Sequence, residues 1–275
     1  SSFIHAMPAY FKHLGIGGIK WVSGYGENGA RGFPQIIGTL ILNDMETGAP
    51  VCIMDGTWIT GVRTAAVSAI TVKYCARKDS RVLGVVGGGV QGRYNLIAIK
   101  EVLPDLSKVK IMDIKREAAE KYRDELGPKT GVEVMICEDV ESLAKGSDII
   151  LTATQRLHEP LIKNEWFERG CLGMGLEASR AWYGDAILNS DKIITDDWAQ
   201  TKSFHSQGAF PDGLPGKYTE LGNIVAGQNK GRENEDERIL AINIGLALED
   251  IIVGNHLYQM ANERGGYQRL PLMEW

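Results

Sequence analysis

The sequence predicts an α/β protein with a doubly wound parallel sheet and a second, smaller α+β part. Between residues 81 and 197, short apolar segments alternate with helical ones, which is typical of a parallel sheet covered by helices. Residues 36–56 read as two strands joined by a turn, which predicts a hairpin. A glycine-rich loop, GVVGGGVQG at 84–92, joins the first strand of the alternating series to its helix.

The elements of the alternating series follow from hydrophobic period and from turn residues. The expected strands cover 81–87, 108–113, 131–137, 147–154, 170–176 and 191–197. The expected helices cover 90–103, 115–126 and 139–146. Gly127-Pro128 is expected to close the second helix, and Asp139 to cap the start of the third.

The rest of the chain is expected to form the smaller part. It is predicted to contain a short strand within 15–31, strands at 36–44 and 51–56, and a helix over 57–77. A last long helix is expected from about Asp236 to Asn262, with core candidates Ile239, Leu240, Ile242, Ile244, Leu246, Ala247, Ile251 and Ile252. We therefore expect a substrate-binding and dimerisation domain made of 1–76 and 246–275, and a nucleotide-binding domain over 77–245.

The composition is that of an ordinary globular protein. Of the 275 residues, 44% are hydrophobic and 24% are charged, and the formal net charge is -5. This mild acidity argues against nucleic acid or an anionic membrane as the main partner, and no apolar run approaches the ~20 residues of a spanning helix. The four cysteines are scattered and no histidine pair has zinc-ligand spacing, so we expect free thiols in a reducing cytoplasm and no metal.

Gly87, Gly89 and Gly92 have the G-x-G-x-x-G spacing of a dinucleotide-binding loop. The spacing alone is a weak signal, but here the loop follows a strand and opens a helix, and Asp113 ends the next strand 21 positions after Gly92. Gly87 would permit the tight turn, Gly89 the approach of a pyrophosphate, and Gly92 the close packing of helix on strand. The alternative is a glycine turn in a doubly wound fold that binds no ligand.

Asp113 decides which dinucleotide is expected. Its carboxylate would accept hydrogen bonds from the adenosine ribose hydroxyls and would repel a 2′-phosphate, so NAD is expected over NADP. Lys115 and Arg116 follow closely and would soften that preference, which keeps NADP as the second choice.

A dehydrogenase of carboxylate substrates also needs cations that fix the carboxylate, usually a bidentate arginine helped by a lysine. Lys20, in the glycine-rich N-terminal stretch, and Arg63, in an alanine-rich helix start, are the candidates. For each of them the alternative is a solvated surface cation.

A series of motifs in chain order resembles the ornithine cyclodeaminase/mu-crystallin family. The first part carries Lys20, Asn28, Gly32-x-Pro34, Gly38, Leu42-x-Asp44, Thr47-Gly48-x-Pro50, Asp55-Gly56, Thr60-x-x-Arg63-Thr64-Ala65-Ala66 and Leu83-Gly84-x-x-Gly87-x-Gly89-x-Gln91. The last part carries Glu220-Leu221-Gly222-x-Ile224-Val225-x-Gly227, Gly231-Arg232 and Gly245-Leu246-Ala247-x-Glu249-Asp250. The resemblance covers nearly the whole chain, and relative to the family we expect the sequence to begin part-way into the N-terminal domain.

The resemblance implies a Rossmann domain joined to a substrate domain whose sheet forms a homodimer. It implies hydride exchange between NAD(P) and the α-carbon of a small amino acid or its imine. It also implies that Lys20 and Arg63 clamp the substrate carboxylate, that Thr64 helps to position the cofactor phosphates, and that Thr154 lies near the nicotinamide half. Val90 and Gln91, between the loop glycines, complete the expected cofactor-binding set.

Two departures from the family pattern concern the chemistry. Glu177 matches the catalytic aspartate of the cyclodeaminases only across a one-residue gap, and EASRAWYGD replaces the usual D-x-P-G-K continuation. His5 stands where cyclodeaminases have an acidic residue, and it is expected to carry a proton at the substrate or to be a packed imidazole. Trp182 and Tyr183 are expected to line the substrate pocket or to lie exposed at a dimer contact.

Three functions remain open at this point. The expected one is an NAD(H)-dependent amino-acid dehydrogenase or imine reductase in which Glu177 handles the proton on nitrogen or water. The second is an ornithine or lysine cyclodeaminase that releases ammonia with catalytic NAD. The third is a non-catalytic NAD(P)H-binding protein of the mu-crystallin kind.

Overall fold

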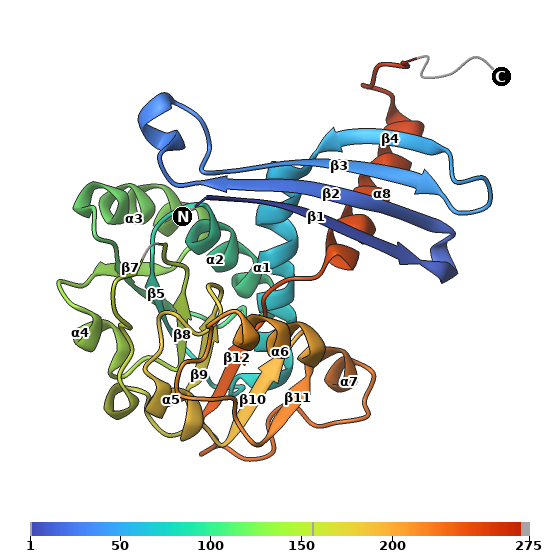
Figure 1. Ribbon diagram of the computed structural model, residues 1–275. Coiled ribbons are helices and arrows are strands. Elements are labelled where there is room, and N and C mark those ends of the chain that lie inside the picture. Colours follow the sequence, from blue (N-terminus) through green and yellow to red (C-terminus); the bar gives the residue numbers. More distant parts are fainter. Residues whose placement is uncertain (1, 156, 271–275) are drawn as a thin grey trace. The chain divides into compact units, whose positions relative to one another are not determined.

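The computed structural model describes residues 2–155 and 157–270 (Figure 1). The chain divides into two compact units, the first made of Ser1–Arg63 and Leu246–Trp275 and the second of Thr64–Gly245. The division falls inside helix α1 (Gly56–Cys75), whereas the expected boundary followed residue 76. The assignment of one part to NAD binding and of the other to substrate binding stays a prediction, and residues 271–275 of the latter lie outside the described residues.

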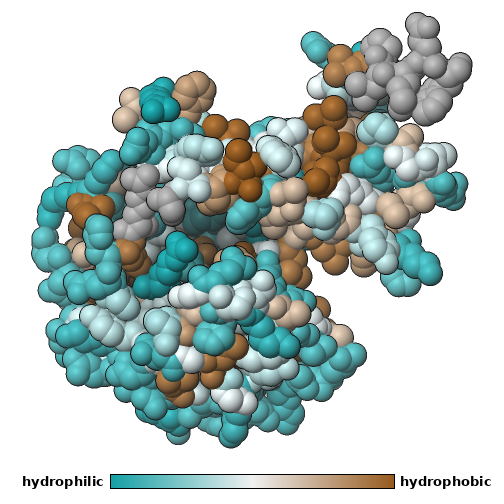
Figure 2. Space-filling model, in the orientation of Figure 1, coloured by the Kyte–Doolittle hydropathy of each residue, from teal (hydrophilic) through white to brown (hydrophobic). Residues whose placement is uncertain are grey.

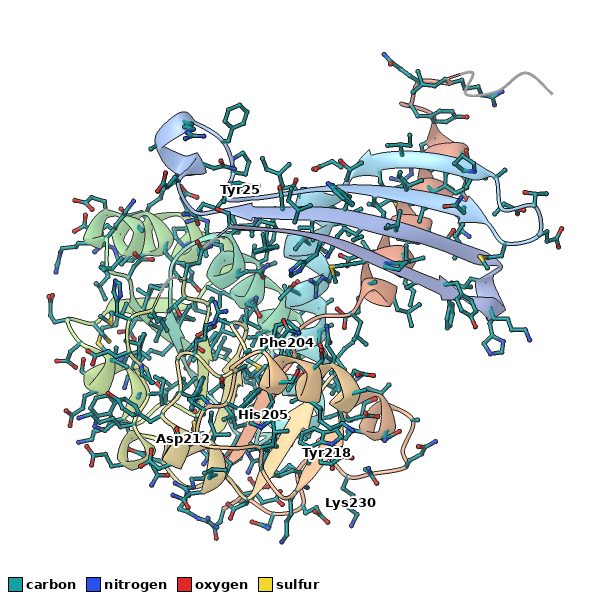
Figure 3. The ribbon with its side chains drawn as sticks, viewed as in Figure 1. Tyr25, Phe204, His205, Asp212, Tyr218 and Lys230 are labelled. Carbon is teal, nitrogen blue, oxygen red and sulfur yellow. The ribbon has the colours of Figure 1, made fainter. Side chains whose placement is uncertain are left out.

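The second unit is built on a parallel sheet, which confirms the predicted fold class. Its strands are β5 (Val82–Val86), β6 (Lys108–Met112), β7 (Glu133–Ile136), β8 (Ile149–Thr152), β9 (Leu172–Gly175), β10 (Lys192–Thr195), β11 (Tyr218–Glu220) and β12 (Ile239–Ile242). They lie in the order β11-β10-β12-β9-β8-β5-β6-β7, and every pair is parallel. Edge strand β11 carries Tyr218, whose ring stacks on Trp198 with 3.7 Å between ring centroids (Figure 3).

Helices follow most of these strands. They are α2 (Val90–Val102), α3 (Arg116–Thr130), α4 (Val140–Ala144), α5 (Gly184–Leu188), α6 (Trp198–Ser206) and α7 (Leu221–Val225), with a 3₁₀ turn at Asn164–Trp166. Strand residues alternate between two buried clusters: Ile149 and Leu151 belong to one cluster, and Ile150 belongs to the other. The central strands are therefore mostly apolar, because both faces of a covered parallel sheet are buried.

The chain changes direction within this sheet beside β5. From β5 it proceeds outward through β6 to β7, and β8 then returns to pair with the other side of β5. Ligands of open α/β sheets bind at the carboxyl ends of the strands next to such a switch point. The loops after β5 and β8 are thus the places to look for a site in this unit.

The first unit contains a four-stranded antiparallel sheet and one long helix. The sheet order is β1 (Ser2–Phe11), β2 (Ile16–Tyr25), β3 (Ile36–Asp44) and β4 (Pro50–Asp55), with 3₁₀ turns at Lys12–Leu14 and Asn28–Arg31. Helix α8 (Ala247–Arg264) packs on one face of the sheet around Ile16, Leu40, Leu42 and Ile251. The predicted hairpin 36–44/51–56 is confirmed as β3 and β4.

The expected helix from Asp236 to Asn262 is wrong in its first half. Residues Ile239–Ile242 form β12, and the helix begins only at Ala247. The apolar run ILAI fits a buried strand as well as a helix face. Gly245, between β12 and α8, has φ 99°, which is not a helical conformation, so one helix cannot run through both segments. Ile239, Leu240 and Ile242 are core residues as expected, but they belong to the sheet, and Ile252 is exposed.

Other elements were not expected or end elsewhere. Strand β1 was not predicted, because SFIHAMPAYF alternates poorly between apolar and polar residues and includes a proline. The proline is tolerated because β1 is an edge strand, the first in the sheet order. The short elements α5, α6, α7 and β11 were also not predicted. Helix α3 runs past Gly127-Pro128 to Thr130, where Gly131 at φ 69° ends it.

The packing of α8 on its sheet can be tested at Gly254. A Cβ at this position would collide with the Cδ2 atom of Leu40, which is fully buried. We predict that Gly254→Val lowers the free energy of unfolding by about 1–3 kcal/mol, the usual cost of overpacking a core. Urea unfolding measures it.

The matched control is Gln259→Val on the exposed face of the same helix. It loses only helix propensity, which is worth roughly 0.5 kcal/mol. Equal losses in the two variants would contradict the close approach of α8 to β3.

Candidate active site

The loop after β5 turns sharply and opens α2. Gly87 lies at φ 107°, a conformation that side chains disfavour, and its N–H donates to the carbonyl of Met112 at 2.8 Å. Gly89 precedes α2 in extended conformation with open space around its Cα. A Cβ on Gly92 would collide with the carbonyl oxygen of Gly87. The loop therefore needs glycine at 87 and 92, and the space at 89 lets another molecule approach the backbone.

Asp113 directly follows β6 and holds this loop in place. Its carboxylate accepts hydrogen bonds from the N–H of Gly88 at 2.8 Å and from the N–H of Lys115 at 2.9 Å. Arg116 forms ion pairs with Glu120 at 3.3 Å and Glu138 at 2.7 Å. The Asp113 carboxylate thus already has a structural role, and its two oxygens retain lone pairs that could accept further hydrogen bonds.

Three further residues of the expected cofactor set, Thr64, Val90 and Gln91, lie on helices. Val90 begins α2 and is exposed, and the Gln91 carbonyl accepts a hydrogen bond from the Asn95 side chain at 2.8 Å. Thr64 is a residue of α1, and its carbonyl accepts from the Ser68 hydroxyl at 3.2 Å. Their contacts with a dinucleotide stay a prediction.

Thr154 and Glu177 meet at the carboxyl ends of β8 and β9. Thr152 and Gly175 are paired in register, so the chains emerge side by side two residues later. The Thr154 hydroxyl donates to Glu177 Oε1 at 3.0 Å. Although Glu177 as a whole is only half-buried, its Oε2 atom is shielded from solvent and has no hydrogen-bond partner among the described residues.

This environment makes Glu177 an unusual acid. Burial raises the pKa of its carboxyl from 4.5 to about 7, against the hydroxyls of Thr152 and Thr154, which lower it. A carboxyl with a pKa near neutrality can both give and take a proton at physiological pH, as general acid–base catalysis requires.

The turn that follows Glu177 is held from several sides. Ala178 has a left-handed backbone at φ 60°, and the Ser179 hydroxyl accepts the buried N–H of Phe210 at 2.8 Å. The indole of Trp182 donates to the Thr152 hydroxyl at 3.1 Å. Trp182 is 1% exposed and packs in the core, so the expectation that it lines a pocket or a dimer contact is wrong.

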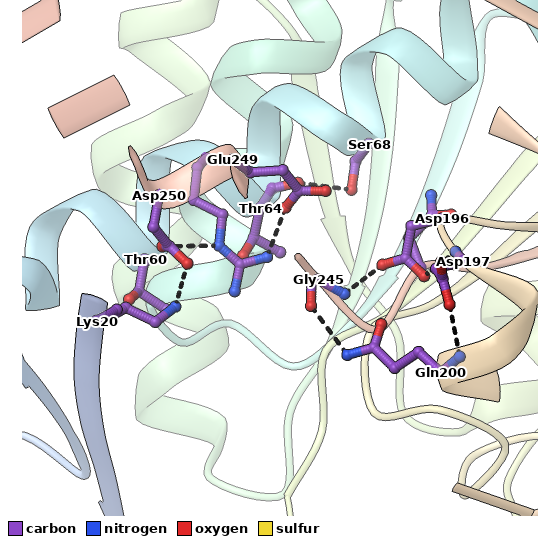
Figure 4. A network of polar contacts seen from close by, with 12 residues as sticks. Lys20, Thr60, Thr64, Ser68, Asp196, Asp197, Gln200, Gly245, Glu249 and Asp250 are labelled. Carbon is purple, nitrogen blue, oxygen red and sulfur yellow. Dashed lines mark hydrogen bonds and ion pairs between the residues drawn. The ribbon is translucent and has the colours of Figure 1, made fainter. Parts of the chain in front are cut away.

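A second polar group lies at the same edge, beyond β10. Asp196 accepts hydrogen bonds from the N–H groups of Gly245 and Asp197, and burial raises the pKa of its carboxyl. The amide of Gln200 donates to the Gly245 carbonyl at 3.2 Å (Figure 4). No sequence pattern indicates this group, because its members become neighbours only through the β10–β12 pairing.

Lys20 and Arg63 lie in one cluster within the first unit. Lys20 Nζ lies 2.6 Å from Asp250 Oδ2, and Arg63 Nε lies 3.2 Å from Asp250 Oδ1 (Figure 4). Arg63 Nη1 is 2.9 Å from Glu249 Oε2. Lys20 is 1% exposed and Arg63 is 8% exposed, so the alternative of solvated surface cations is excluded.

Burial also governs the charge of Lys20. It lowers the pKa of the ammonium, and Arg63 lowers it further, while Asp250 and Glu249 raise it. The sequence analysis predicts no role for Asp250, although Glu249-Asp250 belongs to the family motif. The feature that could have indicated one is a pair of acidic residues in the first turn of α8, where the helix dipole favours negative charge.

His5 lies on β1, two residues along the strand from Met7, which pairs with Lys20. It opposes Val22, whereas Met7 opposes Lys20, so His5 and Lys20 share one face of the sheet. The imidazole is exposed, and its ring centroid is 4.5 Å from that of Phe3. A substrate contact by His5 stays a prediction.

Two kinds of site are absent from the described residues. No group of three or more His, Cys, Asp or Glu side chains within 2–155 and 157–270 is placed to hold a metal ion. No helix in the described part of the chain is long and apolar enough to cross a membrane.

Comparison with known proteins gives a consistent result. Residues 1–265 match the model of the "Ornithine cyclodeaminase/mu-crystallin family". The nodulation efficiency protein NfeD of Rhizobium meliloti is 32% identical over 265 residues, which are 96% of this chain and 82% of the relative.

Two solved structures are similar over nearly the whole chain. Thermococcus litoralis Δ(1)-pyrroline-2-carboxylate reductase, in complex with NADH and L-proline, has a TM-score of 0.88 and 33% identity, covering 98% of this chain and 85% of the other. An archaeal alanine dehydrogenase dimer with bound NAD has a TM-score of 0.87 and 30% identity, covering 99% and 85%.

The raised pKa of Glu177 predicts a pH-dependent stability. Between pH 4.5 and 7 the folded protein keeps a proton that the unfolded chain releases. The stabilisation by the neutral carboxyl is full below the unfolded pKa and is lost as the pH rises through about 7. Glu177→Gln, which stays neutral, should therefore gain about 3 kcal/mol over the parent protein between pH 4.5 and pH 8.

Urea unfolding of both proteins across this range measures the difference. The control is Glu101→Gln, an exposed residue of α2, whose difference from the parent should stay flat. A flat difference for Glu177→Gln would mean that its carboxyl is hydrated and titrates normally.

Proposed function

The chain belongs to the ornithine cyclodeaminase/mu-crystallin family, and we propose that it is an NAD(H)-dependent oxidoreductase acting at the α-carbon of an amino acid or of its imine. The observation that carries this proposal is the buried Glu177 carboxyl at the sheet edge, with its pKa of about 7. A protein that only stores a ligand has no need of a titratable group in that state. Similar proteins named as an alanine dehydrogenase and a pyrroline-2-carboxylate reductase support it.

The loop residues fit an NAD cofactor. The turn at Gly87 and the open backbone at Gly89 would receive the pyrophosphate at the start of α2, together with Val90, Gln91 and Gly92. Asp113 would accept from the ribose hydroxyls, and its charge disfavours the 2′-phosphate of NADP. Thr154 would lie near the nicotinamide half and Thr64 near the phosphates. When bound, the cofactor supplies or accepts the hydride.

The chain's own residues have distinct tasks in this proposal. Lys20 and Arg63 bind the substrate carboxylate, and His5 contacts the substrate beside them. Glu177 moves the proton: in the reductive direction its neutral form gives a proton to the nitrogen, and in the oxidative direction its carboxylate takes one. Thr154 holds Glu177 Oε1, which leaves Oε2 as the atom that exchanges the proton.

The proposal is tested by substrate panels. The protein is mixed with NAD and L-amino acids, and with NADH plus 2-oxo acids and ammonia or methylamine, or plus cyclic imines. Net change at the NADH absorbance band is the expected result. Ammonia release from ornithine or lysine with no net change would indicate a cyclodeaminase instead, and inactivity with tight NADH binding would indicate a binding protein.

Glu177→Gln should lower kcat by about 10²-fold or more, because general acid–base catalysis contributes at least that much. The fold of the variant is intact if its thermal unfolding stays cooperative. The measurement is steady-state kinetics with the best substrate of the panel, and Glu101→Gln should keep the parent kcat. A loss below about threefold would remove Glu177 from the chemistry.

We also propose that the antiparallel sheet forms a homodimer through its face opposite α8. The exposed side of the sheet carries Trp21, Ile53 and Ile4, each about half exposed, and apolar residues are visible over this sheet in Figure 2. An exposed apolar face of this kind indicates an association surface. The dimer form of the similar alanine dehydrogenase is consistent with it.

Light scattering after gel filtration tests the dimer. Ile53→Asp should convert it to a monomer, because the charge would be buried unpaired at the interface. The control Val225→Asp, on an exposed site of α7, should remain dimeric. A dimeric Ile53→Asp variant would contradict the proposed face.

The cysteines bear on the compartment. Cys52, Cys75, Cys137 and Cys171 are all free thiols. Cys75, Cys137 and Cys171 are buried. We propose a cytoplasmic location, because free thiols are typical of a reducing environment.

A further inference from the structure

The expected carboxylate clamp already holds two carboxylates of its own. Lys20 and Arg63 bring two positive charges, and Asp250 and Glu249 bring two negative ones, all within the first unit. The cluster is therefore balanced as it stands. A substrate carboxylate that joined it without any exchange would add an uncompensated charge to a buried site.

The two internal carboxylates differ in how they are held. The Asp250 side chain is 0% exposed and bonds both cations, to Lys20 at 2.6 Å and to Arg63 Nε at 3.2 Å. The Glu249 side chain is 18% exposed and forms an ion pair with the outer nitrogen of Arg63, Nη1, at 2.9 Å. Removing Asp250 would take away the anion that both buried cations share, whereas the Glu249 carboxylate pairs with Arg63 from a partly exposed position.

We propose that Glu249 is a displaceable internal carboxylate, which occupies Arg63 in the ligand-free protein and gives way to the carboxylate of the substrate. Asp250 stays in place and positions Lys20 and Arg63 throughout. The inference rests on the proposed function, since it needs a carboxylate ligand at Arg63. It adds a residue that sets affinity and selects for ligands that carry a carboxylate.

Chemical equivalence supports the exchange. The guanidinium of Arg63 forms the same charge-assisted hydrogen bond with a glutamate side chain and with an amino-acid carboxylate. Exchanging one for the other keeps the cluster balanced, and the released Glu249 recovers its hydration. A neutral ligand or an amine without a carboxylate offers Arg63 no replacement, so it leaves Glu249 in place.

The test is the affinity for simple amino acids. Calorimetric titration of L-alanine and L-proline into the full chain in the presence of NADH measures binding without turnover. Glu249→Gln and Glu249→Ala should each bind the preferred acid about three- to tenfold more tightly, because an internal competitor has been removed. Steady-state KM for the same substrate should fall in parallel, while the dissociation constant for NADH stays unchanged.

Two further variants sharpen the result. Glu263→Gln, an exposed glutamate of the same helix, is the matched control and should bind as the parent does. Asp250→Asn should act in the opposite direction and bind more weakly, because Lys20 and Arg63 lose their fixed anionic partner.

The outcomes separate the inference from the proposed function. If the parent binds one of the acids and the Glu249 variants bind it equally or more weakly, the displacement is overturned and the proposed function stands. If neither the parent nor any variant binds these two acids or any member of the substrate panel, both are overturned.

Discussion

The buried carboxylate of Asp250 is the constraint on which the first unit depends. Desolvating an ion costs several kcal/mol, and here three ionic groups are buried together. The cost is met only because Lys20 on β2 and Arg63 on α1 both reach the same acceptor at the start of α8. Removing one member of such a group typically costs about 3–5 kcal/mol. The cluster therefore fixes three segments that are far apart in sequence, including the C-terminal helix.

The second unit follows a different rule, which comes from its topology. Parallel strands bring their carboxyl ends to one edge, so the residues just after β5, β6, β8 and β9 gather there whatever their sequence distance. Gly87, Asp113, Thr154 and Glu177 are the residues at those positions. The sheet itself is largely apolar and buried, and its role is to position the loops that follow its strands. The polar side chains that could bind a ligand or transfer a proton lie on those loops.

The sequence predicted well what depends on local pattern. The glycine loop needed its glycines for backbone reasons that the structure shows at 87 and 92, and the alternation of strands and helices predicted the parallel sheet. Prediction failed where tertiary context decided. The run ILAI was assigned to a helix because four apolar residues fit either period, and only its pairing between β9 and β10 makes it a strand.

The same limit applied to the site. Lys20 and Arg63 were identified as candidates from their residue types and from family resemblance, but their internal partners were not. Asp250 lies 230 positions from Lys20, and no local sequence pattern predicts that the two side chains are in contact. Trp182 likewise was read as a pocket or contact residue, since its burial depends on distant strands.

Two carboxyl groups of this protein show how environment assigns chemistry. Asp250 is buried with two cations, so burial and charge compensation together give a fixed ionic partner. Glu177 has its carboxyl shielded beside the hydroxyls of Thr152 and Thr154, with one oxygen unpartnered among the described residues, and burial raises its pKa to about 7. The first arrangement holds Lys20 and Arg63 in place, because both cations bond the same carboxylate. The second favours proton exchange, because either protonation state of Glu177 is reached at little cost near neutrality. The division between a binding cluster and a proton-transferring group therefore follows from the partners each carboxyl has, and not from the residue type.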